Sequence, residues 1–157
     1  MNLPEQYSEI KIAFAQAADL AGISIPLSEI EVKFDVAPHV PPPSLPAGKM
    51  AVYVFMFGER CLKVGKAGPK SAARFCSQHY EANRAPSTLA RSLLKGQADI
   101  GVSGLDDENV GKWIRDNTSR VNFLIPSIHG MFALSLLEAF VQCRLKPKFE
   151  GFAGQLA

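Results

Sequence analysis

The sequence is poor in cysteine and in long apolar runs, and its charges nearly balance. Its three cysteines, Cys61, Cys76 and Cys143, are odd in number and widely spaced. This usage fits reduced thiols better than a secreted disulfide framework. No segment reaches the roughly 18 uncharged apolar residues of a membrane span, and residues 1–9 lack the basic and apolar regions of a signal peptide. We therefore expect a cytoplasmic protein that does not enter a membrane.

Several familiar chemistries also lack their sequence patterns. A structural zinc site uses two pairs of ligands, and the members of each pair lie close together in the sequence. The three cysteines and the three histidines, His39, His79 and His129, do not form two such pairs. Nothing local marks a cysteine as activated for Cys-His catalysis. The glycines of residues 65–68 lack the spacing of a Walker phosphate loop, and a turn after a strand explains them.

The composition is that of a folded protein with one core. The 157 residues are 47% hydrophobic and 20% charged, which is typical of a globular domain. We expect residues 1–48 to form an N-terminal helix, a strand and a proline-rich linker, and residues 49–157 to form the main folded unit.

The net charge of +2 hides an uneven distribution. Residues 1–48 are acidic, and residues 60–95 carry eight basic side chains against Glu81 alone. The basic residues are Arg60, Lys63, Lys66, Lys70, Arg74, Arg84, Arg91 and Lys95. A phosphate-binding surface requires such a concentration of positive charge. Scattered solubilising charges are the alternative interpretation.

Hydrophobic periodicity and turn residues predict the order of the secondary structure elements. A helix (4–21), a strand (30–36) and a proline-rich loop (38–46) come first. A hairpin (50–57 and 60–65), three helices (70–82, 87–95 and 106–116), a strand (121–125) and an apolar helix (131–145) follow. The order predicts an α+β protein: a small antiparallel three-stranded sheet flanked by helices, with an extra N-terminal helix and strand.

Four motifs stand on these elements in a characteristic order. They are Ala51-Val52-Tyr53 on the first hairpin strand, Lys63-Val64-Gly65 with Lys66 on the second, Arg74 in the next helix, and Leu137-Glu138-Ala139-Phe140 in the last helix. In order, spacing and placement, these motifs resemble the GIY-YIG nuclease superfamily. Its second motif begins with lysine, Lys63, as in a phage-associated branch of the superfamily that it resembles. Many members carry asparagine at the position where this chain has Glu150.

The resemblance implies a metal-dependent endonuclease that hydrolyses phosphodiester bonds in nucleic acid, with DNA as the default substrate. It implies that Tyr53, Lys63, Arg74 and Glu138 are catalytic, and that Glu138 holds Mg²⁺, with Mn²⁺ as an alternative ion. Phage, restriction or mobile-element biology is the setting that it suggests.

Elementary chemistry supports a role for each of these residues. Glu138 lies among apolar residues, where a carboxylate needs a partner such as a divalent cation, or an arginine such as Arg74. Tyr53 is the candidate to deprotonate or orient the attacking water. It can act as a base only if nearby cations such as Lys63 and Lys66 favour the phenolate. A core aromatic is the alternative for Tyr53.

Other side chains are candidates for binding the nucleic acid. Arg74 offers a planar fork of donors to a phosphate, although it lies off the apolar face of its expected helix and could be merely solubilising. Lys66, Lys70, His79 and Arg84 are the remaining candidates, with a packed core histidine as the alternative for His79.

Two other functions stay open. One is a non-catalytic nucleic-acid-binding or adaptor domain that retains the nuclease fold. The other is a protein-interaction module in which residues 1–48 dock a partner or cover the basic face. A homodimer is a further alternative, because cutting two strands with one small site often requires a second copy.

Overall fold

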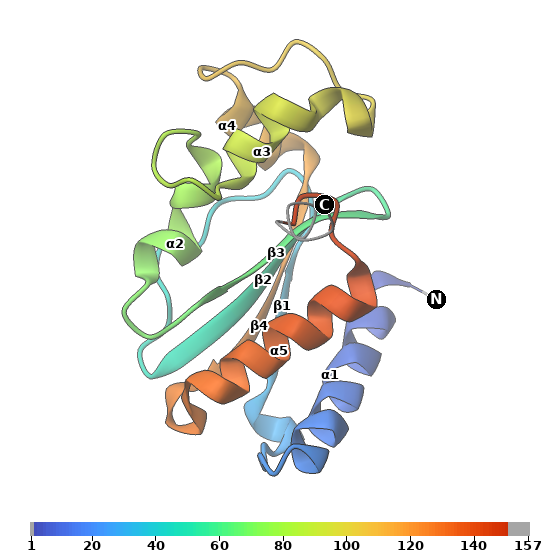
Figure 1. Ribbon diagram of the computed structural model, residues 1–157, viewed down its shortest axis with the longest axis vertical. Helices are drawn as coiled ribbons and strands as arrows, with labels where there is room; N and C mark the ends of the chain where they lie inside the picture. Colours follow the sequence, from blue (N-terminus) through green and yellow to red (C-terminus); the bar gives the residue numbers. More distant parts are fainter. Residues whose placement is uncertain (1, 151–157) are drawn as a thin grey trace, which may run out of the picture.

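The hairpin expected from the sequence lies at one side of a four-stranded antiparallel sheet in the computed structural model, which describes residues 2–150 (Figure 1). Strand β2 (Lys49–Phe57) pairs with β3 (Arg60–Ala67) on one side and with β4 (Ser119–Pro126) on the other. Strand β1 (Glu31–Asp35) pairs with β4, which gives the order β1-β4-β2-β3. Strand β3 is therefore an edge strand.

Helices cover both faces of this sheet. Helices α1 (Leu3–Leu20) and α5 (Gly130–Leu145) pack on one face. Helices α2 (Ala72–Cys76), α3 (Leu89–Gly96) and α4 (Val110–Asn117) pack on the other. Alternate residues of β2 enter the two cores, Val52 and Val54 on the α5 side and Tyr53 and Phe55 on the other. Burial on both faces explains why this strand is continuously apolar.

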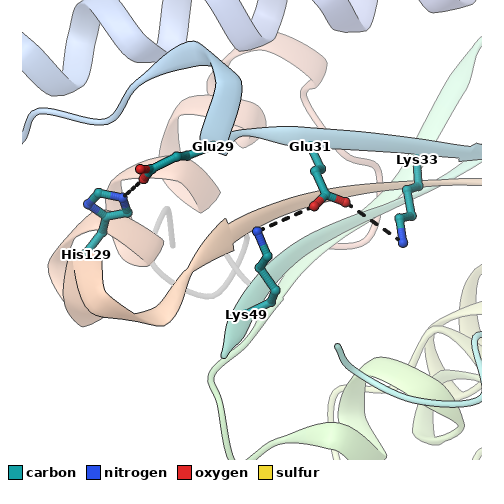
Figure 2. A network of polar contacts seen from close by, with 5 residues as sticks. All are labelled: Glu29, Glu31, Lys33, Lys49 and His129. Carbon is teal, nitrogen blue, oxygen red and sulfur yellow. Dashed lines mark hydrogen bonds and ion pairs between the residues drawn. The ribbon is translucent and has the colours of Figure 1, made fainter. Parts of the chain in front are cut away.

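The N-terminal segment belongs to the same core. Phe14 of α1 is buried and its ring lies 6.0 Å from that of Phe140 in α5. Figure 2 shows polar contacts that fasten this segment: His129 Nε2 lies 2.6 Å from Glu29 Oε2, and Lys49 Nζ lies 3.4 Å from Glu31 Oε1. The expected α+β architecture is confirmed, and the extra strand extends the three-stranded sheet to four strands.

The helix expected over residues 70–82 is shorter than predicted. Helix α2 ends at Cys76, and a short 3₁₀ helix (Gln78–Tyr80) follows it. This break turns His79 and Tyr80 into the core, where both find hydrogen-bond partners. Tertiary hydrogen bonds outweigh the helical periodicity here. Residues 151–157 of the expected main unit lie outside the described residues.

The segment Ser127–Leu145, which contains α5, is long and apolar enough to cross a membrane by length and composition alone. Ala133, Leu134, Leu137 and Val141 of this helix are instead buried against the sheet. The helix expected to be buried is thus covered on one face only, since Met131 and Phe132 are 51% and 89% exposed.

The packing of α1 leads to a stability prediction. Phe14→Ala should lower the free energy of unfolding by about 3–5 kcal/mol, because it leaves a cavity between α1 and α5. Ile12→Ala on the same helix, where the side chain is 48% exposed, should change it by less than about 0.5 kcal/mol. Urea unfolding measures both values. Equal small losses would mean that α1 does not stabilise the core.

Candidate functional site

The ring of Tyr53 on β2 lies across Gly65 of the edge strand β3. The two residues are direct partners in the antiparallel register. A Cβ atom at position 65 would lie 2.5 Å from Tyr53 Oη and 2.6 Å from its Cζ, closer than atoms can approach. Glycine is therefore required opposite Tyr53, and this gives the second sequence motif a physical reason.

A hydrogen-bond chain fixes the orientation of the Tyr53 hydroxyl group. The backbone N–H of Leu89 donates to His79 Nδ1 over 3.1 Å. A neutral imidazole then carries its proton on Nε2, which lies 2.6 Å from Tyr53 Oη and donates to it. The hydroxyl proton of Tyr53 is consequently left for a different acceptor. Tyr53 is 0% exposed and His79 is 2% exposed, so both pack in the core as their alternative interpretations expected. This burial favours an orienting role for His79 over direct phosphate contact.

Burial keeps both members of this pair neutral. It lowers the pKa of His79 to about 3, and the charges of Lys63, Arg120 and Arg74 act in the same direction. Burial raises the pKa of Tyr53 to about 12, although Arg74 and Arg120 oppose this shift. The cations that favour the phenolate are thus these arginines rather than the expected lysines. At neutral pH the Tyr53 hydroxyl is a hydrogen-bond donor.

Arg120 is a member of the site that the sequence analysis missed. It is 0% exposed on β4, and its Cζ lies 5.4 Å from the centre of the Tyr53 ring. Its Nε donates to Asn122 Oδ1 over 2.9 Å and its Nη1 to Tyr80 Oη over 3.2 Å. Within residues 2–150 it forms no ion pair. The sequence held only a weak signal of a polar site on this strand, namely the polar Asn122 among the apolar residues 121–125.

Glu138 of α5 reaches the same strand edge from the other face of the sheet. Its Oε2 accepts a hydrogen bond from Lys66 Nζ over 2.6 Å, in a partly buried ion pair. The partner of this carboxylate is therefore Lys66 and not Arg74. Because β3 alternates its faces, Lys66 points toward α5 while Gly65 leaves room for Tyr53 on the opposite side.

Lys63 and Glu150 complete the cluster. Lys63 is 7% exposed, and among the described residues its Nζ donates only to the carbonyl of Phe149, over a long 3.5 Å. Burial lowers its pKa, while the charge of Glu150 raises it. The carboxylate of Glu150 accepts from the N–H of Val64 over 3.1 Å and from Gln142 Nε2 over 3.3 Å. Burial raises the pKa of Glu150, and Lys63 opposes this.

The remaining candidates lie at the periphery. Arg74 is exposed, donates from Nη2 to Ser87 Oγ over 3.1 Å, and is near enough to act on the pKa of Tyr53. Lys70 is exposed in the turn ahead of α2. Arg84 pairs with Glu81 over 2.7 Å at the surface. Across residues 2–150, no hydrogen bond or ion pair links Lys70 or Arg84 to the cluster.

A metal would find few protein ligands at this site. In the described part of the chain, no group of three or more His, Cys, Asp or Glu residues is placed to hold an ion. Glu138 offers one carboxylate, which fits Mg²⁺ if water and substrate phosphate oxygens supply the other ligands. Lys66 occupies one of the two carboxylate oxygens, Oε2.

No family model, curated protein or solved structure matches this chain. The resemblance to the GIY-YIG superfamily therefore stays a prediction, based on the motifs, on the order of the elements and on the cluster around β3.

The lowered pKa of His79 predicts a pH-dependent stability. The unfolded chain binds a proton near pH 6.5, but folded His79 stays neutral to about pH 3. The folded state then binds fewer protons, so the free energy of unfolding falls as the pH drops from 6.5 toward 4, by up to about 1.4 kcal/mol per pH unit from this group. His39, whose pKa burial also lowers, adds in the same direction.

Urea unfolding at several pH values between 7 and 4 measures this decline. We expect His79→Gln to flatten it, because the proton-binding group is removed. Nitrogen NMR of the wild type should show a neutral His79 with the proton on Nε2 at pH 5. A protonated ring at pH 5, or an equal decline in the variant, would contradict the proposed hydrogen-bond chain.

Proposed function

We propose that this protein is a metal-dependent endonuclease of the GIY-YIG type, which hydrolyses phosphodiester bonds in nucleic acid, with DNA as the default substrate. The observation that carries the proposal is the gathering of Tyr53, Lys63, Lys66, Arg74 and Glu138 around one sheet edge. These five residues come from four elements, of which β2, β3 and α2 follow one another in the sequence and α5 lies more than 50 residues further on. The three cysteines are free, which accords with the expected cytoplasmic location.

Positive charge is the first requirement for binding a scissile phosphate. Arg74 is exposed and presents a guanidinium fork that matches two phosphate oxygens. Lys63 adds a buried ammonium group with unused donors. Preorganised cations of this kind stabilise the charge that develops at phosphorus in the transition state.

Tyr53 orients the attacking water or a phosphate oxygen rather than removing a proton. Its pKa of about 12 makes the phenolate scarce at neutral pH. His79 already donates to its oxygen, which leaves the hydroxyl proton for another acceptor. Because Tyr53 is 0% exposed, a substrate has to open the packing around it to become that acceptor. A rigid, buried phenol held in this way contributes geometry at little entropic cost on binding.

Glu138 is the residue that would hold Mg²⁺ or Mn²⁺. Such an ion, when bound, supplies Lewis-acid stabilisation of the phosphate and lowers the pKa of water. Lys66 pairs with this carboxylate and holds its position when no ion is bound. The pair also restrains Lys66, which becomes available to the phosphate when the carboxylate gains a different partner.

The second candidate function is a nucleic-acid-binding domain without cleavage. The direct Lys66–Glu138 ion pair favours it, because this contact satisfies the carboxylate without any metal. Salt-sensitive binding without metal-dependent cleavage would identify this function.

Glu138→Gln should abolish cleavage while leaving the fold. The amide keeps the shape of the side chain but loses the charge that holds a metal, and we expect nicking to fall at least 100-fold. Supercoiled plasmid and single-stranded DNA and RNA, incubated with Mg²⁺, Mn²⁺ or a chelator, provide the assay.

Glu81→Gln is the matched control, since Glu81 is an exposed carboxylate that pairs with Arg84 outside the cluster. It should cleave as the wild type does. Equal cleavage by the Glu138→Gln variant would remove the metal assignment. No cleavage by folded wild type, with binding retained, would favour the non-catalytic function.

A further inference from the structure

A cavity of about 440 Å³ adjoins the cluster on the α3 side of β3. Lys63, Glu150 and Ser87 line it, and each of these also belongs to the candidate site or contacts it. Lys95 at the end of α3 and Lys148 after α5 line it as well. The cavity is large enough for one nucleotide, since small-molecule sites begin at about 300 Å³.

Lys63 points to an anion in this cavity. Its ammonium group has three hydrogen-bond donors, but the hydrogen bond that it makes is the long one to the Phe149 carbonyl. Within residues 2–150 no carboxylate lies within ion-pair distance of it. A cation that is 7% exposed and so weakly partnered carries a large desolvation cost, which a bound phosphate would offset.

The other charges around the cavity agree with an anionic ligand. Three lysines and two carboxylates, Asp99 and Glu150, line it, which leaves a net charge of +1. The carboxylate of Glu150 is already occupied by the N–H of Val64 and by Gln142. These neutral donors leave its negative charge in place, so the exposed ammonium groups of Lys95 and Lys148 provide the excess of positive charge that would attract an anion.

The cavity wall also offers an apolar surface. The ring of Phe149 lines the cavity and packs on Gly96, where an added Cβ would lie 2.6 Å from the ring. A glycine at position 96 thus lets the ring lie close against α3. Aromatic rings at such positions provide a surface on which a nucleic-acid base can stack.

We propose that this cavity binds the nucleotide that adjoins the scissile phosphate, with Lys95 and Lys148 contacting its backbone phosphate and Phe149 its base, while Lys63 contacts the scissile phosphate at the border of the cavity. The proposal rests on the nuclease function proposed above and adds the direction in which the strand leaves the site. The hydrogen bond from Arg74 to Ser87 links the candidate site to the cavity wall.

Binding of a labelled single-stranded oligonucleotide to the full chain tests this proposal without cleavage. Fluorescence anisotropy is followed in chelator over a series of salt concentrations. For a single strand, removing one lysine that binds a phosphate should make the slope of log K against log salt shallower by about 0.7. We expect the double variant Lys95→Ser/Lys148→Ser to make this slope shallower by about 1.4. Its affinity at about 0.1 M salt should fall by roughly 25-fold.

Lys11→Ser/Lys112→Ser is the control, because it removes the same charge from helices α1 and α4, away from the cavity, and it should leave the slope unchanged. Equal slopes for the two double variants, with wild-type binding intact, would overturn the cavity assignment alone. Absence of oligonucleotide binding by the wild type would overturn the proposed function as well. Inorganic phosphate that binds the wild type but not Lys95→Ser/Lys148→Ser, together with equal oligonucleotide slopes for the two double variants, would assign the cavity to a free anion instead of a strand.

Discussion

The close packing of Tyr53 on Gly65 is the constraint on which the candidate site depends. A Cβ at position 65 would lie 2.5 Å from the Tyr53 hydroxyl oxygen, so the ring can cross the edge strand only where that strand lacks a side chain. The crossing brings the hydroxyl group to His79, and the Leu89 amide fixes the histidine tautomer. A buried aromatic of the core thereby becomes a directed polar group at the border of the sheet.

At an edge strand, side chains from the two faces of a sheet can reach one another around the edge. At a central strand the sheet itself keeps them apart. Strand β3 receives Tyr53 and His79 from the face covered by α2 and α3, and Glu138 from the face covered by α5. Lys63 and Lys66, on opposite sides of the same strand, complete the charge distribution. A strand of nucleic acid could approach this edge without displacing the core, which is a physical reason to place a phosphodiester site there.

Local patterns in the sequence predict much of this arrangement. Alternation and turn residues predict the hairpin and β1, and Gly22 and Pro147 predict where α1 and α5 end. Partners that depend on long-range contacts were not predictable. Glu138 pairs with Lys66, which lies 72 residues away in the sequence, and Arg120 approaches Tyr53 from another strand. The break after Cys76 has the same origin, because the burial of His79 and Tyr80 depends on partners beyond their own helix.

A crystal structure of the Glu138→Gln variant with a short single-stranded oligonucleotide would test the central claim most directly. The account predicts a backbone phosphate within hydrogen-bonding distance of both the Tyr53 hydroxyl and the Arg74 guanidinium, with the ring of Tyr53 still lying over Gly65. A strand bound elsewhere, with the Tyr53 hydroxyl facing no phosphate or ordered water, would contradict it.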